Sequence, residues 1–170
     1  MRLKIRYYSG LFALLLMFTA VWQPGVAATK MPELTFRTIE GAVITSADLK
    51  GHPVLIVFWA TDCSSCIKEI PELIDLHRDY QDTQAKILAV AMYYDPPNRV
   101  VSMSKGMQLP YSIIIDPQAK LSQALNVMVT PTHILVAPDG SIEKRVVGLM
   151  SSRDIRTFFD SKLAKQAETR

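Results

Sequence analysis

The stretch that decides the fold runs from residue 54 to residue 66 and reads VLIVFWATDCSSC. Its first seven residues form a continuous apolar run that is rich in β-branched and aromatic side chains. A run of this length and composition favours a central strand that is covered on both faces. The two cysteines follow where this strand ends, and Ile67, Ile70 and Leu73 then recur at helical spacing. The sequence therefore places a pair of thiols between a buried strand and a helix, which Pro71 is expected to kink.

The rest of the chain alternates strands with helices. Further strands are expected over residues 34–36, 43–44, 86–92, 111–115, 132–136 and 142–147, and further helices over 95–106, over 121–125 and from 151 onward. A short turn capped by Ser46 is expected before the central strand. This order predicts an α/β domain in which a central mixed β-sheet is flanked by helices on both faces.

The length and charge of the chain limit the classes of function that it can have. The chain has 170 residues, of which 49% are hydrophobic and 21% are charged, and this suits one domain with its own core. The net charge of +3 comes from Arg2, Lys4 and Arg6 near the start, because the remaining 16 basic residues balance 16 acidic ones. A neutral body gives no support for binding nucleic acid or an anionic membrane.

Residues 1–28 are typical of a signal peptide. The three basic residues precede an apolar run over residues 11–21, which Pro24 and Gly25 end, and small residues follow. The apolar run is about half of the ~20 residues that a membrane-spanning helix needs. We therefore expect residues 1–28 to be cleaved and residues 29–170 to form a single domain in the periplasm or another extracytoplasmic space. The alternative is that the segment remains as an uncleaved membrane anchor.

Cys63 and Cys66 are the only cysteines in the sequence, and chemistry explains them better than stability does. Disulfides persist outside the cytosol, but a bridge across so small a loop removes little entropy from the unfolded chain. A structural zinc site would need a second ligand pair, which the sequence does not offer. A thiol at the start of a helix ionises more easily, because it meets unpaired N–H groups and the positive end of the helix dipole. We therefore expect Cys63 to attack and Cys66, one turn later, to resolve.

Residues 58–71, which contain both cysteines, resemble the active-site stretch of thioredoxin-like proteins and, more narrowly, of the exported TlpA/ResA-type thiol–disulfide oxidoreductases. The resemblance extends to residues 48–51, 129–132 and 139–148, and so it spans nearly all of residues 30–165. It implies a thioredoxin-like fold. It also implies an enzyme that exchanges thiols and disulfides with no cofactor beyond its own redox-active disulfide.

The resemblance implies roles for residues outside the cysteine pair. Pro131 matches a cis-proline that faces the cysteines, and Thr130 matches the residue that pairs with an incoming substrate strand. Trp59 matches an aromatic residue beside the site. Glu69 matches an acid three residues after the second cysteine, and a partly buried carboxyl there is suited to exchange a proton with that thiol. Thioredoxins place a buried aspartate where this chain has Val57, which leaves Glu69 as the nearby candidate.

Two positions depart from the family pattern. Asp62 stands where members of the family commonly have tryptophan, and its charge disfavours a thiolate at Cys63. Ser64 and Ser65 stand where many members include a proline, and their hydroxyl groups are suited to stabilise the thiolate. Because these effects oppose each other, the sequence does not set the redox potential.

Two function classes remain open from the sequence. In the first, as the resemblance implies, the enzyme reduces disulfides of exported proteins and is recharged by a membrane electron donor, with cytochrome c maturation as one context. The oxidase or isomerase direction is the alternative within this class. In the second class, Cys63, Cys66 and His133 bind copper for delivery, although copper proteins of this fold generally space their cysteines one residue further apart. We expect a monomer with no bound metal and no nucleic-acid partner.

Overall fold

The computed structural model describes residues 29–168, and the predicted signal peptide lies outside the described residues. The strands are β1 (Thr35–Arg37), β2 (Val43–Thr45), β3 (Val54–Trp59), β4 (Lys86–Ala91), β5 (Ser112–Ile115), β6 (Thr132–Val136) and β7 (Ile142–Val147). The helices are α1 (Ser64–Tyr80), α2 (Pro97–Gly106), α3 (Lys120–Ala124) and α4 (Ser152–Glu168). Within the described range, no helix is both long enough and apolar enough to cross a membrane.

β3 lies at the centre of a five-stranded sheet, whose order is β5-β4-β3-β6-β7. It pairs in parallel with β4 and antiparallel with β6, so the sheet is mixed. All six residues of β3 are buried, as its uninterrupted apolar sequence predicts. β1 and β2 form a separate antiparallel hairpin beside this sheet.

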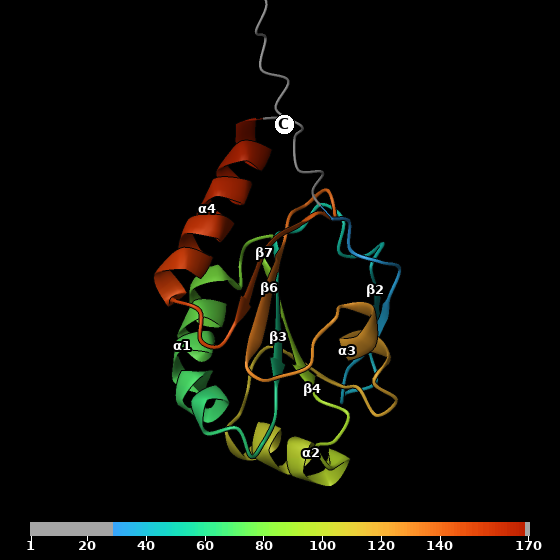
Figure 1. Cartoon of the computed structure of the whole chain (residues 1–170). Coiled ribbons are helices and arrows are strands. Elements are labelled where there is room, and N and C mark those ends of the chain that lie inside the picture. The colour runs from blue at the N-terminus through green and yellow to red at the C-terminus, as the bar shows by residue number, and fades with distance from the viewer. Residues whose placement is uncertain (1–28, 169–170) are drawn as a thin grey trace, which may run out of the picture.

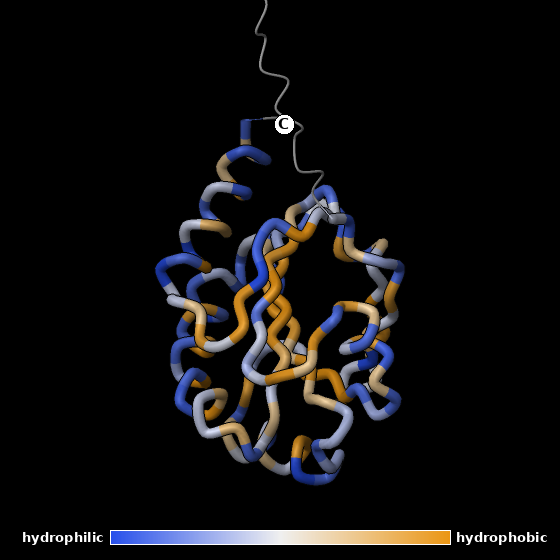
Figure 2. Tube along the Cα trace, viewed as in Figure 1, coloured by the Kyte–Doolittle hydropathy of each residue, from blue (hydrophilic) through white to orange (hydrophobic). Residues whose placement is uncertain are grey.

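Each face of the sheet has its own apolar layer. α1 and α4 cover one face, and α3 and the β1–β2 hairpin cover the other (Figure 1). Because side chains alternate along a strand, Leu55, Val57 and Trp59 all pack on the face that α1 and α4 cover. His133 lies opposite Val57 in the β3–β6 ladder and therefore belongs to the same face. The apolar colour in Figure 2 is concentrated in the central strands, whereas the helices carry more polar residues. The predicted α/β class with a central mixed sheet is confirmed.

Individual elements agree closely with the predictions, with one local difference. The strand expected over residues 54–60 is β3, and α1 continues through Pro71. Ser46 does not cap the turn after it, so that prediction is wrong. Its hydroxyl instead accepts the Leu34 N–H and donates to the Pro32 carbonyl, each at 2.8 Å. The hairpin brings these partners close, and the hydroxyl bonds to them rather than to its own turn.

Candidate active site

Both cysteines lie where β3 gives way to α1. Cys63 is the N-cap of α1 with an extended backbone (φ −85°, ψ 101°), and its Sγ accepts the Cys66 N–H at 3.3 Å. The two sulfurs form a disulfide, and the Cα atoms lie 5.3 Å apart. Cys66 is only 3% exposed, whereas Cys63 is partly exposed. A disulfide that approaches from solvent therefore meets Cys63 first.

The groups around Cys63 favour a thiolate there after reduction. The first turn of α1 contains no acidic residue, so nothing within the helix offsets the positive end of its dipole. The Ser65 hydroxyl lies 3.4 Å from Cys63 Sγ. Asp62 is exposed, and solvent weakens the opposing effect of its charge. The helix terminus and the Ser65 hydroxyl act in favour of a thiolate at Cys63, and the exposed Asp62 acts weakly against it.

A buried carboxylate fixes the loop that leads into Cys63. Asp95, which is 4% exposed, accepts the Thr61 N–H at 2.6 Å and the Thr61 hydroxyl at 2.7 Å. Asp95 lies between β4 and α2, 34 residues along the chain from Thr61. From its sequence, Asp95 was expected only at the start of a helix, and its contact with Thr61 was not predicted. β3 and β4 are parallel neighbours, so the loops that follow them lie side by side at the carboxyl ends of the strands. Expecting these two strands to pair would have indicated this contact.

The Thr130–Pro131 peptide bond is cis, as the resemblance implies. Thr132 pairs with Phe58 across β3 and β6, so Pro131 lies level with the end of β3, where the cysteine loop begins. Pro131 is buried, and its carbonyl accepts the Gly148 N–H at 2.8 Å. Thr130 is partly exposed at the same end of the sheet.

Glu69 and His133 form a buried pair between α1 and β6. Glu69 is 5% exposed and His133 is fully buried. Glu69 Oε1 lies 2.7 Å from His133 Nε2, and His133 Nδ1 lies 3.0 Å from the Gly148 carbonyl oxygen. Both residues were candidates from the sequence, but their pairing was not predicted, because packing of the helix on the sheet joins positions 64 residues apart.

The pairing with Glu69 occupies His133, which the copper-delivery alternative requires as a copper ligand. Both ring nitrogens of His133 lie within hydrogen-bond distance of other groups, and Cys66 is buried. Across residues 29–168, no cluster of three or more histidine, cysteine, aspartate or glutamate side chains is arranged to hold a metal ion. His133 is thus a partner of Glu69 rather than an available third ligand.

Cys66 and Glu69 line the same small cavity. Its walls include Cys66, Glu69, Trp59 and Tyr111, and it has room for about one water molecule. Trp59 Nε1 and Glu69 Oε2 are buried and have no hydrogen-bond partner in the part of the chain that the structure describes. Burial raises the pKa of Tyr111, and the charge of Glu69 raises it further. Trp59 itself is 4% exposed, so its ring packs inside the site rather than on its surface.

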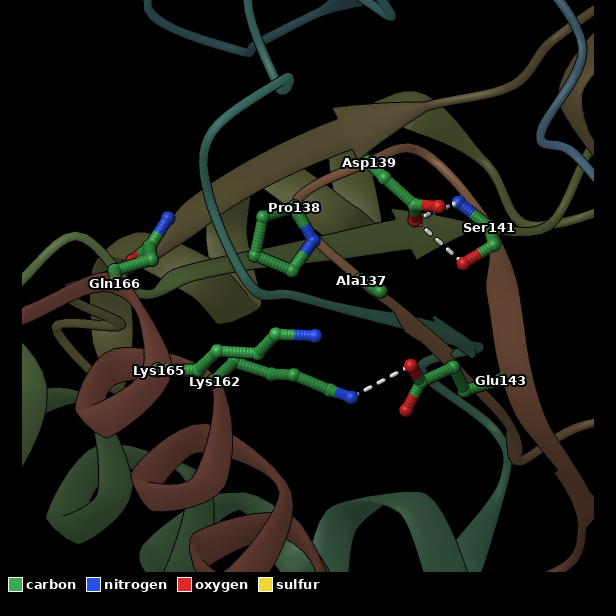
Figure 3. A pocket seen from close by; sticks show the side chains of 8 residues that line it. All are labelled: Ala137, Pro138, Asp139, Ser141, Glu143, Lys162, Lys165 and Gln166. Carbon is green, nitrogen blue, oxygen red and sulfur yellow. Dashed lines mark hydrogen bonds and ion pairs between the residues drawn. The ribbon is translucent and has the colours of Figure 1, made fainter. Parts of the chain in front are cut away.

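A larger hollow, of about 310 Å³, lies away from the cysteines between the β6–β7 turn and the last turns of α4 (Figure 3). Because β6 runs antiparallel to β3, this turn lies beside Val54, at the far end of the central strand. Lys162 is paired there with Glu143 at 2.6 Å, and Asp139 accepts the Ser141 N–H at 2.9 Å. The hollow is separate from the redox site.

Comparisons with known proteins agree with this geometry. The family model described as AhpC/TSA family matches residues 27–145. The thiol-disulfide oxidoreductase ResA of Geobacillus thermodenitrificans is 30% identical over 130 residues, which cover 76% of this chain and 74% of that protein. The solution structure of a thioredoxin from Neisseria meningitidis gives a TM-score of 0.74 at 30% identity, covering 79% of this chain and 90% of the other. The crystal structure of StoA from Bacillus subtilis gives 0.66 at 25% identity, covering 75% and 96%.

Proposed function

We propose that this chain reduces disulfides of exported proteins through Cys63 and Cys66. The chain belongs to the AhpC/TSA family and is a thiol–disulfide oxidoreductase of the ResA type. The observation that carries this proposal is the cysteine pair at the N-terminus of α1, with one sulfur accessible and the other buried. The cis-proline at the adjacent strand end supports it, because Thr130 there is open to an extended substrate.

The reaction has two exchange steps. The Cys63 thiolate attacks one sulfur of the substrate disulfide, the substrate S–S bond breaks, and the departing thiolate takes up a proton. Cys66 then loses its proton and attacks Cys63 Sγ, which releases the second substrate thiol and forms the Cys63–Cys66 disulfide. Two electrons pass from the enzyme to the substrate, and a membrane-bound dithiol donor returns them.

Glu69 is the proposed proton acceptor for Cys66. It follows Cys66 by three residues on α1, and both side chains line the same small cavity. A thiolate is the attacking species in exchange, so a carboxylate beside the resolving thiol speeds the second step. Glu69 does not need to contact the substrate for this role.

Substrate docks over Thr130 and Pro131 in this proposal. Exposed apolar side chains flank the two residues along the chain and across β7, and these are Met128, Val129, Val147 and Leu149. Val147 is held at this place because it pairs with Thr132. Such a surface suits an extended, partly apolar segment of a protein substrate. Trp59 supports this surface from inside the domain.

The extracytoplasmic location is also proposed. The basic and apolar pattern of residues 1–28 supports export, and disulfide substrates accumulate in oxidising compartments. A role in cytochrome c maturation and a monomeric state are parts of the same proposal. The reduction potential of the cysteine pair tests its direction, because a value near −270 mV marks a reductant and one near −120 mV marks an oxidant.

Trapping of intermediates tests the roles of the two thiols. Cys66→Ser should accumulate a mixed disulfide with oxidised protein substrates, because the resolving thiol is absent. Cys63→Ser is the matched control and should accumulate none, since its remaining sulfur is buried. Non-reducing electrophoresis followed by mass mapping measures both, and equal trapping by the two variants would refute the assignment.

A further inference from the structure

The contacts of His133 fix where its protons lie. A carbonyl oxygen only accepts hydrogen bonds, so Nδ1, at 3.0 Å from the Gly148 carbonyl, carries a hydrogen. Nε2 therefore faces Glu69 Oε1, at 2.7 Å, either as the acceptor of a carboxylic acid proton or as the donor of an imidazolium proton. In both arrangements one proton lies between Nε2 and Oε1.

One oxygen of the Glu69 carboxyl is free to accept a proton. Glu69 Oε1 is engaged by His133, whereas Glu69 Oε2 is buried and has no hydrogen-bond partner among residues 29–168. The same carboxyl lines the cavity that Cys66 enters. With the shared proton on Nε2, Glu69 is a carboxylate, and its Oε2 is the acceptor for the proton that Cys66 releases. The proton then stays within the pair, close to the Cys66 thiolate, and this limits the unbalanced charge in the apolar layer.

We propose that His133 is a positioning residue for thiol–disulfide exchange: it holds the Glu69 carboxyl beside Cys66 and shares a proton with it. This inference rests on the proposed role of Glu69. It adds His133 as the hydrogen-bond partner that stabilises a buried carboxyl at this place. Without the imidazole, Glu69 would lie buried with two unpartnered oxygens.

The surroundings of His133 hold few other titratable groups. Its neighbours across the ladders are Val57 on β3 and Val146 on β7, both apolar. α1 contributes Glu69 and Cys66, and Tyr111 lies on the cavity before β5. The buried side chains of α4 are Ile155, Phe158 and Phe159. On the outer side of Glu69, a surface groove is lined by Lys68 and Glu72 of α1 and by Leu149, Met150 and Ser151, which precede α4.

His133→Gln separates proton sharing from packing, because glutamine can still donate a hydrogen bond to Oε1 but does not titrate in this range. The full-length protein is reduced and reacted with oxidised glutathione in single-turnover experiments from pH 5 to pH 9. The first step is measured in a Cys66→Ser background, and the resolution step in the intact pair. We expect the first step to stay within about twofold, and resolution near pH 6 to slow by about tenfold with its pH profile displaced upward.

Two further variants make the result decisive. His52→Gln is the control, because His52 lies before β3 at the end opposite the cysteines, and its resolution profile should match that of the unchanged protein. His133→Asn, whose side chain is too short to reach Oε1, should slow resolution at least as much and serves if the glutamine variant is unstable. A resolution profile unchanged in a folded His133 variant, or equal slowing of both steps, would overturn the inference.

The Glu69→Gln variant separates a failure of the positioning role of His133 from a failure of the proposed role of Glu69. If Glu69→Gln leaves resolution unchanged, the proton acceptor itself is misassigned, and the role of His133 falls with it. If Glu69→Gln slows resolution and His133→Gln does not, only the positioning role is refuted. The double variant should be no slower than Glu69→Gln alone, since both substitutions act on one unit.

Discussion

Replacing Asp95 with alanine should destabilise the domain strongly, although Asp95 lies outside the cysteine motif. The substitution removes two buried hydrogen bonds to a carboxylate, from the Thr61 N–H at 2.6 Å and the Thr61 hydroxyl at 2.7 Å. Hydrogen bonds to a charged group each contribute about 1.5–3 kcal/mol, so we expect the loss of two to lower the free energy of unfolding by about 3–6 kcal/mol. That is a large share of the ~5–15 kcal/mol that a domain usually has.

The assay is urea unfolding at pH 7, followed by far-ultraviolet circular dichroism and by tryptophan fluorescence. Thermal unfolding should show a decrease in Tm of about 9–18 °C, at about 3 °C per kcal/mol for a domain of this size. The rate of Cys63 alkylation in the reduced protein should also change, because the loop that carries Cys63 is no longer fixed through Thr61.

Asp48 provides a matched control for this experiment. It makes the same two kinds of hydrogen bond, accepting the Thr45 N–H at 2.8 Å and the Thr45 hydroxyl at 2.6 Å, but it is exposed to solvent. Water replaces the lost bonds there, so Asp48→Ala should destabilise the domain much less. Equal losses for the two variants would show that burial of Asp95 is not what makes its bonds strong, and the reasoning would be wrong.

Three further predictions concern titration and packing. Burial, and then the charge of Glu69, raise the pKa of Tyr111, so stability should fall as pH rises above about 10, and Tyr111→Phe should weaken that decline in urea midpoints. Burial lowers the pKa of His77, so stability should fall as pH drops below about 6.5, and a flat acid limb in His77→Gln would confirm the source. Tyr80 donates to Asp160 at 2.6 Å, and Tyr80→Phe should lower the free energy of unfolding by about 1 kcal/mol in the same assay.

The strands and the cysteine junction were predictable because their signals are local. The apolar run at residues 54–59 favours a covered strand, and so does the run at residues 87–91. The thiol pair was placed at a helix start because Ile67, Ile70 and Leu73 recur at helical spacing directly after it. The cis bond at Pro131 was different, because only the resemblance to a family indicated it, and the residues themselves did not.

The parts of the site that the sequence did not predict depend on packing between distant elements. His133 meets Glu69 only because α1 crosses the face of β6, and no spacing rule joins a helix position to a strand position 64 residues away. Asp95 and Thr61 meet because β3 and β4 end side by side. Ser46 failed as a predicted cap for the same reason, since tertiary partners competed with the local turn.

The residues of the site come from two parts of the chain that are synthesised at different times. β3, α1 and β4 form one continuous unit that carries Cys63, Cys66 and Glu69, whereas Pro131 and His133 arrive with β6, later in synthesis. A chain interrupted before β6 would possess both thiols without the imidazole or the proline loop. Because Pro131 and His133 both belong to this late segment, the site is complete only when β6 has joined the sheet between β3 and β7.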